Sequence, residues 1–140
     1  PYTMPISDIT GLRAAVDNVI AEEDMVGRHA KIAAATRKAV TEAGLKLYLE
    51  SGYSNTVTVI EVPEGLTDQQ ILSTMRDKYN VMISGCFDVL AGKVIRIGHM
   101  GENANIEDMA QTFDAMDKTF ADLGYPLACS MKETFLQAVK

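Results

Sequence analysis

The stretch Gly92-Lys93-Val94-Ile95-Arg96-Ile97-Gly98-His99-Met100-Gly101 has the clearest pattern in the sequence. It predicts a β-strand that follows one glycine turn and ends in a second loop that contains glycine. Because side chains alternate along a strand, Val94 and Arg96 share one face, and Ile95 and Ile97 share the other. An arginine among three β-branched neighbours is expected to be partly withdrawn from water, and its guanidinium then needs an anion.

The source of that anion is left open by the stretch itself. Arg96 can pair with a nearby aspartate or glutamate, extend along the surface to keep its charge in water, or bind an anionic ligand. The continuation Gly98-His99-Met100-Gly101 favours a simple turn over a backbone anion site. His99 is interpreted as a packed or surface residue more readily than as a general base, because the sequence shows no partner for it.

The composition is that of an ordinary globular domain, with 140 residues, 47% hydrophobic and 23% charged. The net charge of −6 and the lack of a basic stripe argue against a nucleic-acid partner. No apolar run is long enough to span a membrane. Cys86 and Cys129 lack metal-ligand spacing and indicate reduced thiols in a cytoplasmic protein, and no metal site is predicted. Since Pro1 is not an initiator methionine, we expect the chain to be part of a longer protein.

Apolar residues at helical spacing predict four helices and a short fifth one, over residues 7–22, 25–43, 67–79, 105–123 and after 128. Ser7 is the expected N-cap of the first helix. Alternating or β-branched residues predict strands over 45–49, 55–62, 81–84 and 93–97. We therefore predict an α+β two-layer sandwich, in which helices cover a small, mainly antiparallel sheet of three to four strands. The first helix is expected to be a connecting helix, because it precedes the compact part.

Sequence motifs of catalysis are missing. There is no Gly-x-Ser-x-Gly turn, no phosphate-binding glycine loop that ends in Lys-Ser or Lys-Thr, and no His-Glu-x-x-His. The eight methionines fall mostly on helix stripes and indicate core packing. No catalytic residue is therefore assigned to this chain.

The order of elements, the run Gly27-Arg28-His29 and above all Arg96-Ile97-Gly98-His99-Met100-Gly101 resemble a known family. This is the C-terminal small domain of class V aminotransferases, which depend on pyridoxal phosphate, and the similarity is greatest to the alanine–glyoxylate and serine–pyruvate branch. The resemblance extends over nearly the whole chain. It implies that residues 1–23 are an interdomain segment with a connecting helix, and that residues 24–140 are the small α+β domain.

The resemblance also implies roles for individual residues. Arg96 matches the family arginine that binds the α-carboxylate of the substrate, which a guanidinium does through two parallel hydrogen bonds. Thr3-Met4-Pro5 matches a Thr-x-Pro stretch that reaches the cofactor phosphate of the other subunit of a homodimer. Thr3 is thus the first candidate for cofactor binding, and Tyr2 is the second. Where the family often has paired glycines, Cys86 takes the second position, which bears on the shape of the substrate entrance.

Two hypotheses about function follow. In the first, the chain is the small domain of an enzyme that transfers an amino group between alanine or serine and pyruvate or glyoxylate. The cofactor lysine would belong to a missing N-terminal large domain, so the isolated chain is predicted to be inactive. In the second, the chain is a stand-alone, non-catalytic α+β module for binding or assembly. The reading frame upstream of Pro1 distinguishes the two hypotheses.

Overall fold

The computed structural model describes residues 3–140, and within them it contains five α-helices and two β-strands. They follow in the order α1 (Ile6–Ala21), α2 (Met25–Glu42), β1 (Val57–Glu61), α3 (Asp68–Tyr79), β2 (Val94–Gly98), α4 (Ile106–Asp122) and α5 (Met131–Ala138). Two short 3₁₀ turns, Asp88–Leu90 and Gly101–Asn103, flank β2. The α+β class predicted from the sequence is confirmed.

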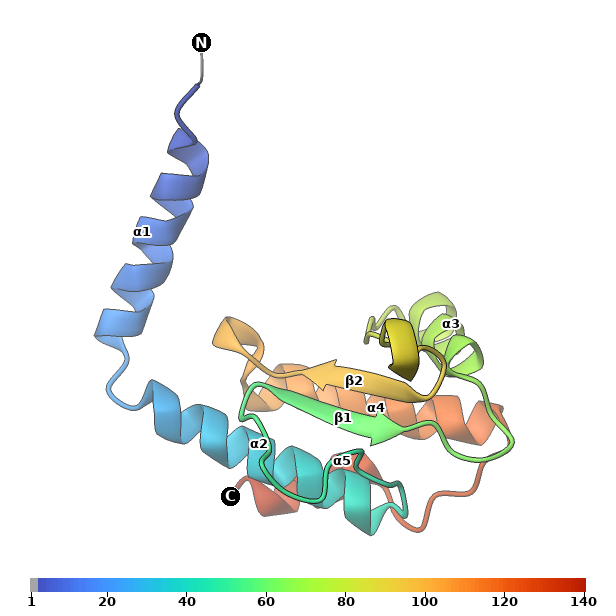
Figure 1. The fold of residues 1–140 in the computed structure, drawn as a ribbon. Helices are drawn as coiled ribbons and strands as arrows, with labels where there is room; N and C mark the ends of the chain where they lie inside the picture. The colour runs from blue at the N-terminus through green and yellow to red at the C-terminus, as the bar shows by residue number, and fades with distance from the viewer. Residues whose placement is uncertain (1–2) are drawn as a thin grey trace.

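The sheet consists of β1 and β2, which pair antiparallel with Val59 opposite Arg96. Ile60, Ile95 and Ile97 lie on the face that enters the core. In Figure 1, α4 runs behind the two strands and α2 and α5 lie below them, and all three helices contribute residues to the core on that face. Val59 and Arg96 lie on the opposite face and are half-buried.

The predicted count of three to four strands is not confirmed. The segments 45–49 and 81–84 lie beside the sheet, but each makes only one isolated bridge to it. Between the second segment and β2, the backbone hydrogen bonds within residues 3–140 are the two that Ser84 exchanges with Arg96, while the Val81 N–H bonds to the Met75 carbonyl at the end of α3.

The core is a single cluster built from the helices and the inner face of the sheet. Aromatic and methionine side chains fill its centre, where Phe113 and Phe135 pack at a ring-centroid distance of 5.3 Å. Local signals place the helices around this core. The side chain of Thr67 caps α3 in a reciprocal pair with Gln70, and Asn105 caps α4. The capping positions predicted for these two helices are confirmed.

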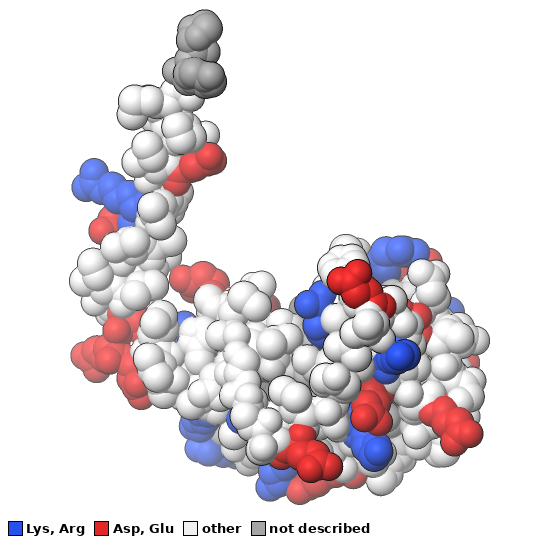
Figure 2. Space-filling model, in the orientation of Figure 1, with Lys and Arg blue, Asp and Glu red and all other residues white. Residues whose placement is uncertain are grey.

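Helix α1 extends away from the rest of the chain (Figure 1). None of its residues is buried. Its surface is mostly uncharged (Figure 2), and it includes exposed apolar side chains, namely Ile6, Ile9, Leu12, Val16, Val19 and Ile20. An exposed apolar stripe of this kind is typical of a surface that packs against another protein segment.

No helix within residues 3–140 combines the length and the apolar character needed to cross a membrane.

Two hydroxyl groups in the core, those of Thr36 and Thr119, have no hydrogen-bond partner among the described residues. A buried hydroxyl without a partner costs about 1–3 kcal/mol. We therefore expect Thr119→Val to raise the free energy of unfolding by about 1 kcal/mol, measured by urea denaturation. The control is Thr58→Val, which removes a buried hydroxyl that is hydrogen-bonded to His99 and should destabilise the fold. An unfolding midpoint for Thr119→Val at or below that of the wild type would contradict the prediction.

Candidate functional site

Arg96 lies in the middle of β2, next to the strand β1 on one side and Ser84 on the other. The Arg96 N–H donates to the Ser84 carbonyl at 2.6 Å, and the Ser84 N–H donates to the Arg96 carbonyl at 3.2 Å. The Arg96 Nε donates to the Gly85 carbonyl at 2.8 Å. The strand of Arg96 is thus flanked by β1 on one side and by Ser84 on the other, and Nε is bonded to Gly85. Together these contacts fix the position of the guanidinium relative to the sheet.

The guanidinium of Arg96 has no carboxylate partner among residues 3–140. The ion pairs found there involve other cations. No described group accepts from Nη1 or Nη2 of Arg96, whose only side-chain bond is the one to Gly85. Of the alternatives drawn from the sequence, an internal aspartate or glutamate is therefore not the partner. Arg96 is thus a half-buried arginine without an anionic partner among the described residues.

His99 follows β2 and is completely buried. Its Nδ1 lies 3.2 Å from the Asn55 carbonyl oxygen, so Nδ1 carries the hydrogen and donates. Its Nε2 then accepts from the Thr58 hydroxyl at 2.9 Å. Burial lowers the pKa of His99 below its ordinary value, which keeps the ring neutral. Both ring nitrogens are engaged inside the protein, and His99 therefore stabilises the turn after β2 rather than serving as a base.

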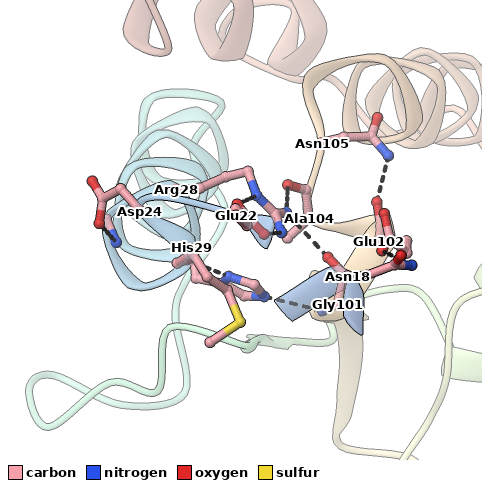
Figure 3. A network of polar contacts seen from close by, with 11 residues as sticks. Asn18, Glu22, Asp24, Arg28, His29, Gly101, Glu102, Ala104 and Asn105 are labelled. Carbon is pink, nitrogen blue, oxygen red and sulfur yellow. Dashed lines mark hydrogen bonds and ion pairs between the residues drawn. The ribbon is translucent and has the colours of Figure 1, made fainter. Parts of the chain in front are cut away.

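The loop after His99 is bound by Arg28 and His29 of α2 (Figure 3). His29 Nδ1 donates to the Met25 carbonyl at 2.7 Å, so its Nε2 accepts from the Gly101 N–H at 3.0 Å. Arg28 Nη1 donates to the Gly101 carbonyl at 3.1 Å and also to the carbonyl of Ala104. Arg28 and His29 thus bind both backbone groups of Gly101. They fix the loop that leaves the strand of Arg96.

Arg28 also joins this loop to the bend between α1 and α2. Its Nε and Nη2 donate to the two carboxylate oxygens of Glu22, with 2.8 Å from Nη2 to Oε2. The hydrogen bond lowers the pKa of Glu22 and raises that of Arg28. Asn18 of α1 donates to Glu102 at 3.3 Å (Figure 3). The bend between α1 and α2 is therefore a joint that links α1 to the Gly101 loop.

Sequence reasoning missed this joint, because the contacts that attach it to the Gly101 loop join distant residues, as in the Arg28 bond to Gly101 with a separation of 73. In the sequence, Arg28 and His29 stand out only through the family resemblance. No periodicity or spacing in the sequence connects either residue to Gly101.

We expect Arg28→Gln to speed amide hydrogen exchange at Gly101 by about tenfold. The change removes a charged donor to the loop carbonyls, a loss of about 1.5 kcal/mol. Exchange is read by NMR, with Gly124 in a different turn as the internal reference. Arg76→Gln is the matched control, since Arg76 is exposed and pairs with its neighbour Asp77. Equal exchange rates at Gly101 in the two variants would show that Arg28 does not hold the loop.

Thr3 lies just before α1 and is exposed, while Tyr2 lies outside the described residues. The helix begins at Ile6, and Pro5 instead of Ser7 occupies the N-cap position. No side chain caps this end, so the first N–H groups of α1 have no side-chain acceptor. Because Pro5 precedes the first residue of α1, its missing N–H does not remove a hydrogen bond from the helix. Thr3 and Arg96 are not brought together, because α1 carries Thr3 away from the sheet (Figure 1).

The lysines of residues 3–140 lie mostly at the surface of this chain. Lys132 is half-buried and pairs with Asp114, and the other lysines are exposed. A lysine that forms a covalent bond to a cofactor carbonyl is normally withdrawn from water, because desolvation supplies its neutral form. Residues 3–140 also contain no group of three or more histidine, cysteine or acidic side chains arranged to hold a metal ion.

No family model matches the chain. The chain is 37% identical over 131 residues to serine–glyoxylate aminotransferase of Arabidopsis thaliana, which is 91% of this chain and 32% of that protein. It is also 37% identical over 131 residues to L-aspartate–glyoxylate aminotransferase of Paracoccus denitrificans, with 91% and 33% covered. The chain thus spans about a third of the length of the curated relatives it matches.

The fold is also found in solved structures. Pyridoxamine–pyruvate aminotransferase from Mesorhizobium loti superposes with a TM-score of 0.90 at 30% sequence identity. The match covers 99% of this chain and 37% of that one. The sequence and structure comparisons therefore both match this chain to about a third of a longer protein.

Proposed function

Because the chain is homologous to the C-terminal part of class V aminotransferases, we propose that it is the small domain of such an enzyme, with pyridoxal phosphate as the cofactor. The enzyme transfers an amino group between a small amino acid, alanine or serine, and an α-keto acid, pyruvate or glyoxylate. One observation supports this role above all. Arg96 is half-buried on the face of the sheet opposite the core cluster and has no carboxylate partner among residues 3–140.

Arg96 binds the α-carboxylate of the substrate in this proposal. A guanidinium and a carboxylate are both planar and can form two parallel, charge-assisted hydrogen bonds. Such a pair fixes the direction of the carboxylate and therefore the position of the α-carbon beside it. Every amino acid and keto acid of the proposed reaction has an α-carboxylate, so one arginine serves both halves of the reaction.

Pyridoxal phosphate, when bound, withdraws electrons from the bonds of the substrate α-carbon. In this proposal, the only contact between this chain and the cofactor is one with the cofactor's phosphate group. Thr3 presents its hydroxyl at the uncapped beginning of α1, where free N–H groups favour an anion, and Tyr2 is the second candidate. Since α1 carries Thr3 away from Arg96, the phosphate it contacts belongs to the other subunit of a homodimer. The covalent anchor for the cofactor comes from a lysine outside this chain.

We divide the chain into residues 1–23, the interdomain segment with its connecting helix, and residues 24–140, the small domain. The apolar stripe of α1 packs on the N-terminal large domain. Met82, Phe87 and Val89, which precede Arg96 in the sequence, are further exposed apolar side chains that packing on this domain would cover. The free thiols of Cys86 and Cys129 fit a cytoplasmic enzyme.

The test compares the 140-residue chain with the complete polypeptide, meaning the product of the entire reading frame that encodes the chain. We expect the complete polypeptide to bind pyridoxal phosphate, seen as a visible absorbance band, and to transaminate pyruvate or glyoxylate. The chain alone should do neither. A complete polypeptide that lacks both properties, or a start codon close to Pro1, would refute the enzyme and favour the stand-alone module.

A further inference from the structure

The Arg96 guanidinium has five N–H donors, and one is already in use. Nε donates to the Gly85 carbonyl at 2.8 Å, while Nη1 and Nη2 have no acceptor within residues 3–140. We infer that a substrate carboxylate binds Arg96 end-on, through Nη1 and Nη2, and that the Gly85 carbonyl is the positioning group that sets this geometry. The inference rests on the proposed function, in which Arg96 binds a carboxylate.

The Gly85 carbonyl is held in place by its own neighbours. Ser84 exchanges two backbone hydrogen bonds with Arg96, at 2.6 and 3.2 Å, which ties the preceding residue to β2. On its other side Gly85 packs against α3. A Cβ atom at this position would lie 3.4 Å from both Asp68 Oδ2 and Leu72 Cδ1. A branched side chain at position 85 would therefore press on α3 and move the carbonyl.

A carbonyl is a suitable acceptor for this purpose, because it satisfies a donor without neutralising the charge. A carboxylate at the same place would form an ion pair with Arg96 and compete with the substrate. The bond to Gly85 also restricts rotation about the last bonds of the side chain, so less rotamer entropy is lost when a ligand binds. Binding through Nε and Nη2 would instead require the Gly85 bond to break.

The geometry can be tested by NMR on the complete polypeptide, which carries the rest of the proposed carboxylate site. A scalar coupling across the hydrogen bond, from Arg96 Nε to the Gly85 carbonyl carbon, reports the contact directly. The signal is assigned with the variant Arg96→Lys, which lacks Nε and should therefore lack the coupling. The ligand probe is sodium pyruvate, and sodium chloride at the same ionic strength is the reference. We expect the coupling to persist in pyruvate while the Cζ and Nη signals of Arg96 shift.

Loss of the coupling in pyruvate would overturn end-on binding and leave the carboxylate role of Arg96 standing. No shift at Arg96 beyond the chloride reference would count against the carboxylate role itself, and with it this inference.

Two variants give a further test. Gly85→Val should weaken pyruvate binding by about 2- to 12-fold, the equivalent of one side chain losing its pre-organisation. Gly98→Val is the matched control, since the nearest atom to a Cβ there is the flexible end of Met100 at 4.0 Å. Equal affinities in the two variants would contradict a positioning role for Gly85.

Discussion

Replacing Arg96 with alanine in the complete polypeptide is expected to lower kcat/KM for its amino-acid substrate by about 100- to 1000-fold. The substitution removes both parallel hydrogen bonds to the carboxylate and the charge that attracts it, a loss of about 3–4 kcal/mol. The same factor should apply to each substrate that carries an α-carboxylate. Steady-state kinetics with both the amino donor and the keto acid measures the effect.

Two further variants separate the role of the arginine from a general loss of structure. Arg96→Lys keeps the charge but not the planar pair of donors, and its kcat/KM should fall between those of the wild type and Arg96→Ala. Arg76→Ala removes an exposed arginine that pairs with Asp77 and should leave the kinetics unchanged. If Arg96→Ala keeps wild-type kcat/KM with both substrates, the carboxylate is bound elsewhere.

The second large effect is expected on stability. His99→Ala should lower the free energy of unfolding of the chain by about 3 kcal/mol. The ring is completely buried, and its loss leaves a cavity and removes a partner from both the Thr58 hydroxyl and the Asn55 carbonyl. Urea denaturation followed by circular dichroism gives the value. His29→Ala is an informative comparison, because His29 is also buried but bonds only backbone groups. A change below 1 kcal/mol for His99→Ala would show that the turn does not depend on the ring.

His99 also predicts a pH dependence with a definite sign. Burial lowers its pKa in the folded chain, so the folded form binds fewer protons than the unfolded form below the ordinary histidine pKa of about 6.5. Stability contributed by His99 is complete above that pH and is lost as the pH falls toward the lowered pKa. The difference in unfolding free energy between wild type and His99→Ala should therefore shrink between pH 7 and about pH 5. A constant or growing difference would contradict a buried neutral ring.

Much of the fold could be predicted because its signals are local. The reciprocal cap of Thr67 and Gln70, the cap at Asn105 and the alternation around Arg96 each depend on residues a few positions apart. These signals marked the starts of α3 and α4 and the strand β2. The resemblance to aminotransferases used the same stretch around Arg96, and the comparisons support it.

What could not be predicted depends on contacts between distant segments. The residues 45–49 and 81–84 have strand-like sequences, but each makes only one bridge to the sheet, and that outcome depends on backbone pairing with residues elsewhere in the chain. The contacts of Arg28 and His29 with Gly101 join segments that nothing in the pattern connects. The candidate site itself is a single arginine in this chain, and its other groups belong to the remainder of the proposed enzyme.

A crystal structure of the complete polypeptide with pyruvate bound would show directly how Arg96 meets a carboxylate. We expect both carboxylate oxygens to lie within about 2.7–2.9 Å of Nη1 and Nη2 of Arg96, with Nε still donating to Gly85. A carboxylate held by another cation, with Arg96 contacting only protein groups, would contradict this expectation.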